Sequence, residues 1–175
     1  MKKRLVRWEA AGFLFVSLLG TILHFLYEWS GNNTWAALIS GVNESTWEHM
    51  KLLFFPLFLF ALVQSRFFRE RRDFWAVKLA GTAAGLLLIP VLFYTYSGVL
   101  GQGIPWVNIA IFYLSALLMF ALDARLLRKG RFSAPWQQLL GLAVLWALAF
   151  VFVWCTFRPP QLNLWQPPTI GCCGI

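Results

Sequence analysis

The sequence is poor in charged residues and has especially few acidic ones. Only 13% of its 175 residues are charged, whereas about a quarter of the residues are charged in a typical soluble domain. Aspartate and glutamate together number 7, histidine occurs twice, and hydrophobic residues make up 59% of the chain. A chain of this composition has too little polar surface to cover a soluble core. The composition therefore excludes an ordinary soluble domain and indicates that lipid surrounds most of the protein.

Several familiar signatures are also missing. The three cysteines form neither a disulfide framework nor the paired spacing of a zinc ribbon. There is no Gly-rich phosphate loop, no nucleophile elbow and no nucleic-acid-binding motif. The net charge of +8 comes from short basic clusters between apolar segments, so we expect no nucleic-acid partner. Without a repeat or a low-complexity linker, residues 1–175 are predicted to form a single transmembrane domain.

Long apolar segments are what the sequence has in abundance. A helix that crosses the hydrocarbon core needs about 20 residues, and its backbone must be hydrogen-bonded internally. Five segments are long enough, at residues 8–29, 46–67, 74–98, 106–128 and 135–157. The predicted fold is therefore all-α, an integral membrane bundle of five transmembrane helices. We expect a partial or re-entrant helix within residues 30–45, and an external tail at 158–175 that is ordered only if it docks on the bundle.

Lysine and arginine predict the orientation of this bundle. They cluster before the first predicted helix, after the second and after the fourth, whereas residues 30–45 and 99–105 contain neither. Basic residues favour the cytoplasmic side of a membrane, so the N-terminus is predicted inside and the C-terminus outside. Four of the acidic residues fall toward the same side, where we expect nearby arginines to pair with them: Glu9, Glu70, Asp73 and Asp123.

The other three acidic residues accompany both histidines around the first external connection. His24, Glu28, Glu44, Glu48 and His49 lie within a stretch of 26 residues. His24 and Glu28 are four residues apart on one predicted helix, so their side chains share a face. An antiparallel hairpin would bring this face close to the start of the next helix. The sequence therefore predicts a mixed cluster of histidine and glutamate beneath the outer surface.

Local structural roles compete with this functional interpretation. Ser45 and Glu48 have the spacing of a capping box, in which the glutamate would reach back to the Ser45 amide. Lys51 would neutralise one glutamate and reduce the cluster to an ion-pair network. Capping does not account for the histidines, and we include Asn43, Ser45 and Lys51 as residues of the predicted pocket.

Two imidazoles and a carboxylate are the ligands of catalytic zinc sites that keep a position open for water. We therefore predict His24, Glu28 and His49 as ligands of zinc or another divalent metal, with Glu44 and Glu48 as catalytic carboxylates. The corresponding function is a metal-dependent membrane hydrolase acting on a lipid-like substrate. The spacing is not that of an HExxH motif. Two alternatives remain, namely a small transporter or ion- or proton-conducting protein, and an accessory subunit with a purely structural cluster.

The stretch from His24-Phe25-Leu26-Tyr27-Glu28-Trp29-Ser30-Gly31 to Asn43-Glu44-Ser45-Thr46-Trp47-Glu48-His49-Met50-Lys51 carries a family resemblance. It resembles a family of uncharacterised small bacterial multi-pass membrane proteins with an HFxYEWSG…NESxWEHxK signature. The resemblance implies the bacterial inner membrane as location and membrane lipids as partners, and it supplies no reaction. The adjacent Cys172 and Cys173 near the end of the chain are further candidate soft metal ligands, although an exposed chain end is the simpler interpretation.

Overall fold

The computed structural model describes residues 2–167, and within that range the chain forms helices and connections without strands. The five long helices are α1 (Lys2–Trp29), α3 (Thr46–Phe67), α4 (Phe74–Leu100), α5 (Pro105–Lys129) and α6 (Pro135–Phe157). A single helical turn, α2 (Thr34–Ala37), lies in the connection between α1 and α3. All five long helices are long and apolar enough to cross a membrane, which confirms the predicted fold class.

The helix ends follow from ordinary local chemistry. Pro105 and Pro135 open α5 and α6 at a position where the missing amide costs no helical hydrogen bond. Gly101 and Gly130 close α4 and α5 in the left-handed conformation, with φ of 72° and 62°. Ser45 caps α3, because its hydroxyl accepts a hydrogen bond from the Glu48 amide at 3.4 Å. The predicted boundaries agree closely, except that the first helix begins near residue 2 rather than 8.

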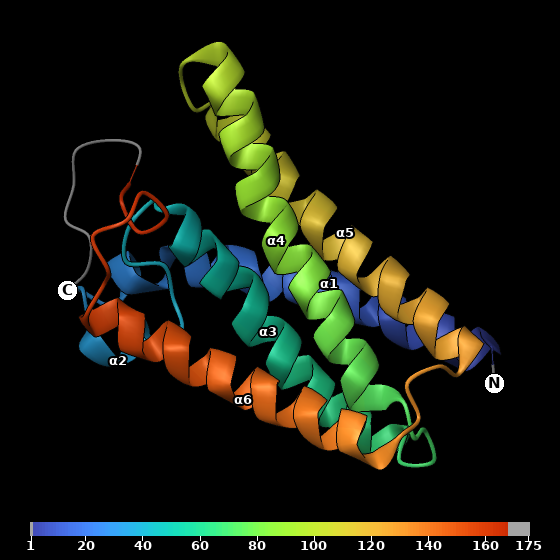
Figure 1. Cartoon of the computed structure of the whole chain (residues 1–175). Helices are drawn as coiled ribbons and strands as arrows, with labels where there is room; N and C mark the ends of the chain where they lie inside the picture. The colour runs from blue at the N-terminus through green and yellow to red at the C-terminus, as the bar shows by residue number, and fades with distance from the viewer. Residues whose placement is uncertain (1, 168–175) are drawn as a thin grey trace.

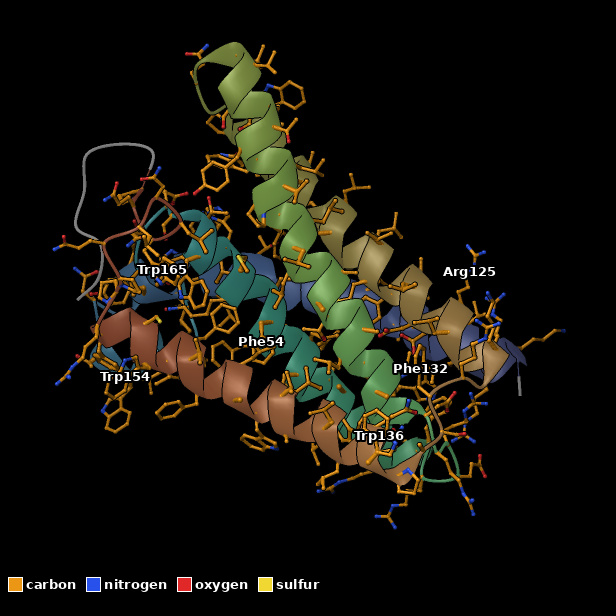
Figure 2. All side chains as sticks on the ribbon, viewed as in Figure 1. Phe54, Arg125, Phe132, Trp136, Trp154 and Trp165 are labelled. Carbon is orange, nitrogen blue, oxygen red and sulfur yellow. The ribbon has the colours of Figure 1, made fainter. Side chains whose placement is uncertain are left out.

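The long helices alternate in direction and form one layered bundle (Figure 1). α3 is the most buried of them and packs against α1, α4 and α6, while α4 and α5 form a closely packed hairpin. The core is rich in aromatic rings, and Phe54 of α3 lies 5.1 Å from Phe152 of α6 between ring centroids (Figure 2). In Figure 1 the connected ends of α4 and α5 stand away from the neighbouring ends of α3 and α6.

The outward faces of the helices are apolar. Leu18 of α1, Leu87 of α4 and Phe150 of α6 are each more than 60% exposed, which a soluble protein would avoid over so many helices. Trp136 and Trp154 are exposed near the two ends of α6 (Figure 2). At 1.5 Å per residue their 18-residue separation corresponds to about 27 Å, close to the thickness of the hydrocarbon core. This arrangement fits a membrane-spanning bundle with tryptophan at both interfaces.

The two ends of the bundle differ in charge. The start of α1, the α3–α4 connection and the α5–α6 connection lie together at one end, where Arg4, Arg71 and Arg128 line one cavity. We call this the basic end. The opposite end contains α2 and the 99–105 connection and is called the histidine end, because His24 and His49 lie there.

The tail is partly docked at the histidine end. The Trp47 amide donates a hydrogen bond to the Leu164 carbonyl oxygen at 3.0 Å, and the Trp47 and Trp165 rings stack 4.5 Å apart. Figure 2 shows Trp165 over the start of α3. The expectation that the tail orders by docking is thus met as far as residue 167. Cys172 and Cys173 lie outside the described residues.

Candidate metal site at the histidine end

Three predicted residues from three segments meet at the histidine end. His24 comes from α1, His49 from the first turn of α3, and Glu44 from the connection just before the Ser45 cap. The His24 Nε2 atom lies 3.6 Å from Glu44 Oε1, and the His49 Nε2 atom lies 3.7 Å from Glu44 Oε2. One candidate ligand atom from each residue can be chosen so that all three lie within 4.8 Å of one another. Among the described residues this is the one such group of histidine, cysteine or carboxylate.

These distances suit a shared ion better than direct hydrogen bonds. Contacts of 3.6 and 3.7 Å are too long for a hydrogen bond between nitrogen and oxygen. Two ligand atoms that each lie about 2.1 Å from a tetrahedral zinc ion are separated by about 3.4 Å. The two contacts of 3.6 and 3.7 Å, made to the two oxygens of Glu44, are close to this separation, and the Glu44 side chain is 60% exposed.

The backbone orients one of the imidazoles. His49 Nδ1 lies 2.9 Å from the Ser45 carbonyl oxygen, which can only accept a hydrogen bond. With the proton on Nδ1, the lone pair of Nε2 is free and points toward Glu44. A histidine ligand that donates its other ring N–H to a carbonyl is the usual arrangement in protein metal sites.

The structure places the remaining predicted residues elsewhere. Glu28 is exposed near the end of α1 and does not belong to the three-residue group. Glu48 and Lys51 are buried and form an ion pair of 2.6 Å. The Ser45 amide donates to Asn43 Oδ1 at 2.9 Å, so Glu48 does not reach back to it as a complete capping box would require. Instead the Glu48 carboxylate accepts from the Val42 amide at 3.1 Å.

The Glu48–Lys51 pair joins three parts of the chain. The Lys51 ammonium donates to the Ala37 carbonyl oxygen and to the Thr156 hydroxyl, both at 3.0 Å. Its side chain is 0% exposed. Together with the Val42 contact, these bonds attach the 30–45 connection to α3 and α6. Because Glu44 lies in that same connection, the ion pair also positions the carboxylate of the candidate metal site.

Two cavities border the three-residue group. One of about 20 Å³, enough for roughly one water molecule, touches Glu44, His49 and Asn108. The other, about 240 Å³, lies between α1, α3 and α5 beside both histidines, and its lining is mainly apolar. Its polar groups include Asn108 and the hydroxyls of Thr21 and Tyr113, which are 2.9 Å apart.

Sequence reasoning missed Asn108, Thr21 and Tyr113 as neighbours of the histidines. Asn108 lies in the first turn of α5, and its side chain also contacts the Tyr96 hydroxyl. The sequence does show that Asn108 is a polar residue in an apolar helix. It does not show that this part of α5 lies beside His49, because the two residues are far apart in the chain.

The fold and this cluster define a class of protein, a multi-pass helical membrane protein with a histidine and glutamate site at one end of the bundle. The chain belongs to a family of unknown function, DUF6512, whose model matches residues 1–175. This agrees with the expectation of an uncharacterised family. Neither the comparison with curated proteins nor the comparison with solved structures gives a match.

Proposed function

We propose that this protein binds one divalent metal ion, best matched by zinc, through His24, His49 and Glu44. The observation that carries the proposal is the convergence of three ligand atoms within 4.8 Å from α1, α3 and the connection between them. The fixed hydrogen bond from His49 Nδ1 to Ser45 supports it, because it leaves Nε2 available as a ligand. In this ligand set Glu44 takes the place that the sequence had given to Glu28.

Three ligands of this kind leave one tetrahedral position open, as in catalytic rather than structural zinc sites. The water-sized cavity beside Glu44 and His49 provides room at that position. Zinc held there would activate a water molecule for attack on a carbonyl carbon. We therefore propose hydrolysis, in which water adds to an ester or amide, the C–O or C–N bond breaks, and an acid and an alcohol or amine are released.

The surroundings favour a lipid-like substrate. The cavity of about 240 Å³ is mainly apolar, reaches both histidines and lies between helices whose outer faces suit lipid. An acyl chain could occupy it with its carbonyl near the site. Glu48 is not free to accept a proton there, because its carboxylate is already engaged by Lys51 and the Val42 amide, and Glu44 serves as a metal ligand.

We further propose that the basic end faces the cytoplasm and the histidine end faces outward, following the distribution of lysine and arginine. We also propose a bacterial inner membrane as its location and membrane lipids as its partners, in line with the family resemblance of the sequence. The site would then act on molecules at the outer surface of that membrane.

Metal content tests the binding proposal directly. The protein would be purified in detergent, incubated with zinc, freed of excess ion and analysed by elemental mass spectrometry. Wild type is expected to hold one zinc ion per chain, and His24→Ala, His49→Ala and Glu44→Gln are expected to lose most of it. Glu28→Gln is the matched control, because Glu28 lies on the same helix as His24 and outside the ligand group. Its metal content should equal that of wild type.

The outcomes separate binding from catalysis. Absence of zinc from wild type, or its retention in both histidine variants, would refute the metal site. If zinc binds, release of a fluorescent acid from acyl esters in liposomes should require zinc and should fall at least tenfold in the variants that lose the metal. Zinc binding without any zinc-dependent cleavage would refute the hydrolase and keep the metal site.

A further inference from the structure

A second polar group lies inside the bundle, toward the basic end. Glu9 of α1, Gln64 of α3, Lys78 of α4 and Asp123 of α5 meet there, and none is more than 3% exposed. The sequence suggested that arginines near the basic end would pair with Glu9 and Asp123. That expectation holds for Asp73, which pairs with Arg71 at 2.7 Å, but Glu9 and Asp123 both pair with Lys78.

Glu9 is surrounded by hydrogen-bond donors. The Lys78 ammonium lies 3.0 Å from Glu9 Oε2 and 3.4 Å from Oε1. The Gln64 amide donates to Oε1 at 2.8 Å. Both carboxylate oxygens therefore have donors, and one of these donors is positively charged.

The Asp123 carboxylate has fewer hydrogen-bond donors around it than the Glu9 carboxylate. Its Oδ2 atom accepts from Lys78 at 2.8 Å, but its buried Oδ1 atom has no hydrogen-bond partner among the described residues. Oδ1 lies against Gly81 of α4, where an added Cβ atom would come within 2.0 Å of it. The Met119 carbonyl oxygen, one turn earlier in α5, also lies near this Cβ position and can accept a hydrogen bond there.

The charges of this group do not balance. Lys78 supplies one positive charge against two carboxylates, and Lys78 and Glu9 are the charged groups that act on Asp123 among the described residues. α6, which also packs on α4, contains no charged residue. An uncompensated charge buried in a membrane protein costs several kcal/mol, so a buried acid tends to take up a proton instead. We propose that Glu9, Lys78 and Asp123 form an internal proton-binding site in which Asp123 carries a proton on Oδ1 at neutral pH.

A metal cation suits the group less well than a proton. Hard cations gather several oxygen ligands, about six to eight for Ca²⁺. Here three of the four carboxylate oxygens already accept hydrogen bonds from Lys78 or Gln64. Only Asp123 Oδ1 and the unpartnered Gln64 Oε1 remain, whereas a proton on Asp123 needs a single acceptor.

Infrared spectroscopy of the full-length protein at pH 7 tests this site, because a protonated carboxyl absorbs apart from ionised carboxylates and amides. Wild type is expected to show one such band, shifted in heavy water. Asp123→Asn should abolish it. Glu9→Gln should abolish it as well, because Lys78 then balances an ionised Asp123. Glu70→Gln, which changes an exposed acid at the basic end, is the control and should leave the band intact.

Each alternative outcome has a defined meaning. A folded wild-type protein without the band, or with a band that persists in Asp123→Asn, would overturn the proposal. A band that appears only after sodium and potassium are replaced by a large organic cation would overturn it in favour of a cation site. Failure of Asp123→Asn to fold would leave the wild-type spectrum and Glu9→Gln to decide. Zinc binding at the other end of the bundle has no bearing on these results.

Discussion

A buried lysine beside a buried glutamate explains how the histidine end is held in shape. Lys51 is fully buried, and its ammonium satisfies Glu48, a backbone carbonyl and a hydroxyl at once. Removing one member of such a pair leaves a charge in the interior without its partner, which typically costs about 3–5 kcal/mol. Removing both together avoids that penalty.

We therefore expect Lys51→Met to lower the free energy of unfolding by about 3–5 kcal/mol, and Lys51→Met combined with Glu48→Gln to lower it by markedly less. The measurement is unfolding in mixed detergent micelles, followed by the reaction of a fluorogenic dye with the buried Cys155 thiol in a background carrying Cys172→Ser and Cys173→Ser. Additive effects of the two substitutions would show that the ion pair contributes nothing beyond its separate members.

The candidate site could be predicted from sequence only in part. The small number of acidic residues and histidines in the chain identified His24, Glu44 and His49, because such residues are costly in a membrane protein and stand out in its sequence. The choice of Glu28 over Glu44 as third ligand relied on helical spacing, which describes one helix and not the path of the following connection. Lys78 escaped notice because in the sequence it is one of several basic residues near helix ends. Its burial depends on how α5 packs on α4 and on the Glu9 side chain of α1, which reaches it.

At the scale of helices, close packing relies on small residues. Gly81 of α4 faces α5 so closely that an added Cβ atom would also lie 3.2 Å from the Met119 carbonyl oxygen. Gly98, in the same helix, has no neighbour within 4 Å of the equivalent position. Glycine at helix contacts lets backbones approach in membrane proteins, where burial of apolar surface provides little driving force.

Gly81→Ala is expected to destabilise the protein by about 1–3 kcal/mol, because the added methyl group must displace Asp123 or separate α4 from α5. Gly98→Ala should be neutral or stabilising by up to about 1 kcal/mol, since alanine favours the helix. Thermal unfolding of both variants in the same detergent gives the comparison. Equal stability of the two variants would contradict the close approach of α4 and α5 at Gly81.

The helices themselves were largely predictable, because length and hydropathy suffice to locate a membrane span. Their tilt was not. The separation of the α4–α5 connection from α3 and α6 depends on side-chain packing between helices distant in sequence, which hydropathy does not record.

At the scale of the whole molecule, the two ends of the bundle should lie on opposite sides of the membrane. In a background with Cys155→Ala, Cys172→Ser and Cys173→Ser, a membrane-impermeant maleimide is expected to label Gln102→Cys in intact cells. The same reagent should label Arg131→Cys only after lysis, because that residue belongs to the basic end. Both positions are exposed, so accessibility within the protein is matched. The reverse pattern would place the histidines on the cytoplasmic side.

The buried Lys78 group has a consequence for how the protein is made. Its members leave the ribosome in the order Glu9, Gln64, Lys78 and Asp123. When α4 enters the bilayer, Lys78 meets a glutamate of α1 and the pair becomes neutral. Asp123 arrives last, with α5, and finds no positive charge left to balance its own. An ionised aspartate costs up to about 3 kcal/mol in an inserting helix, so α5 enters most easily with its acid already protonated. The order of synthesis and the charge of the finished interior thus favour the same protonation state.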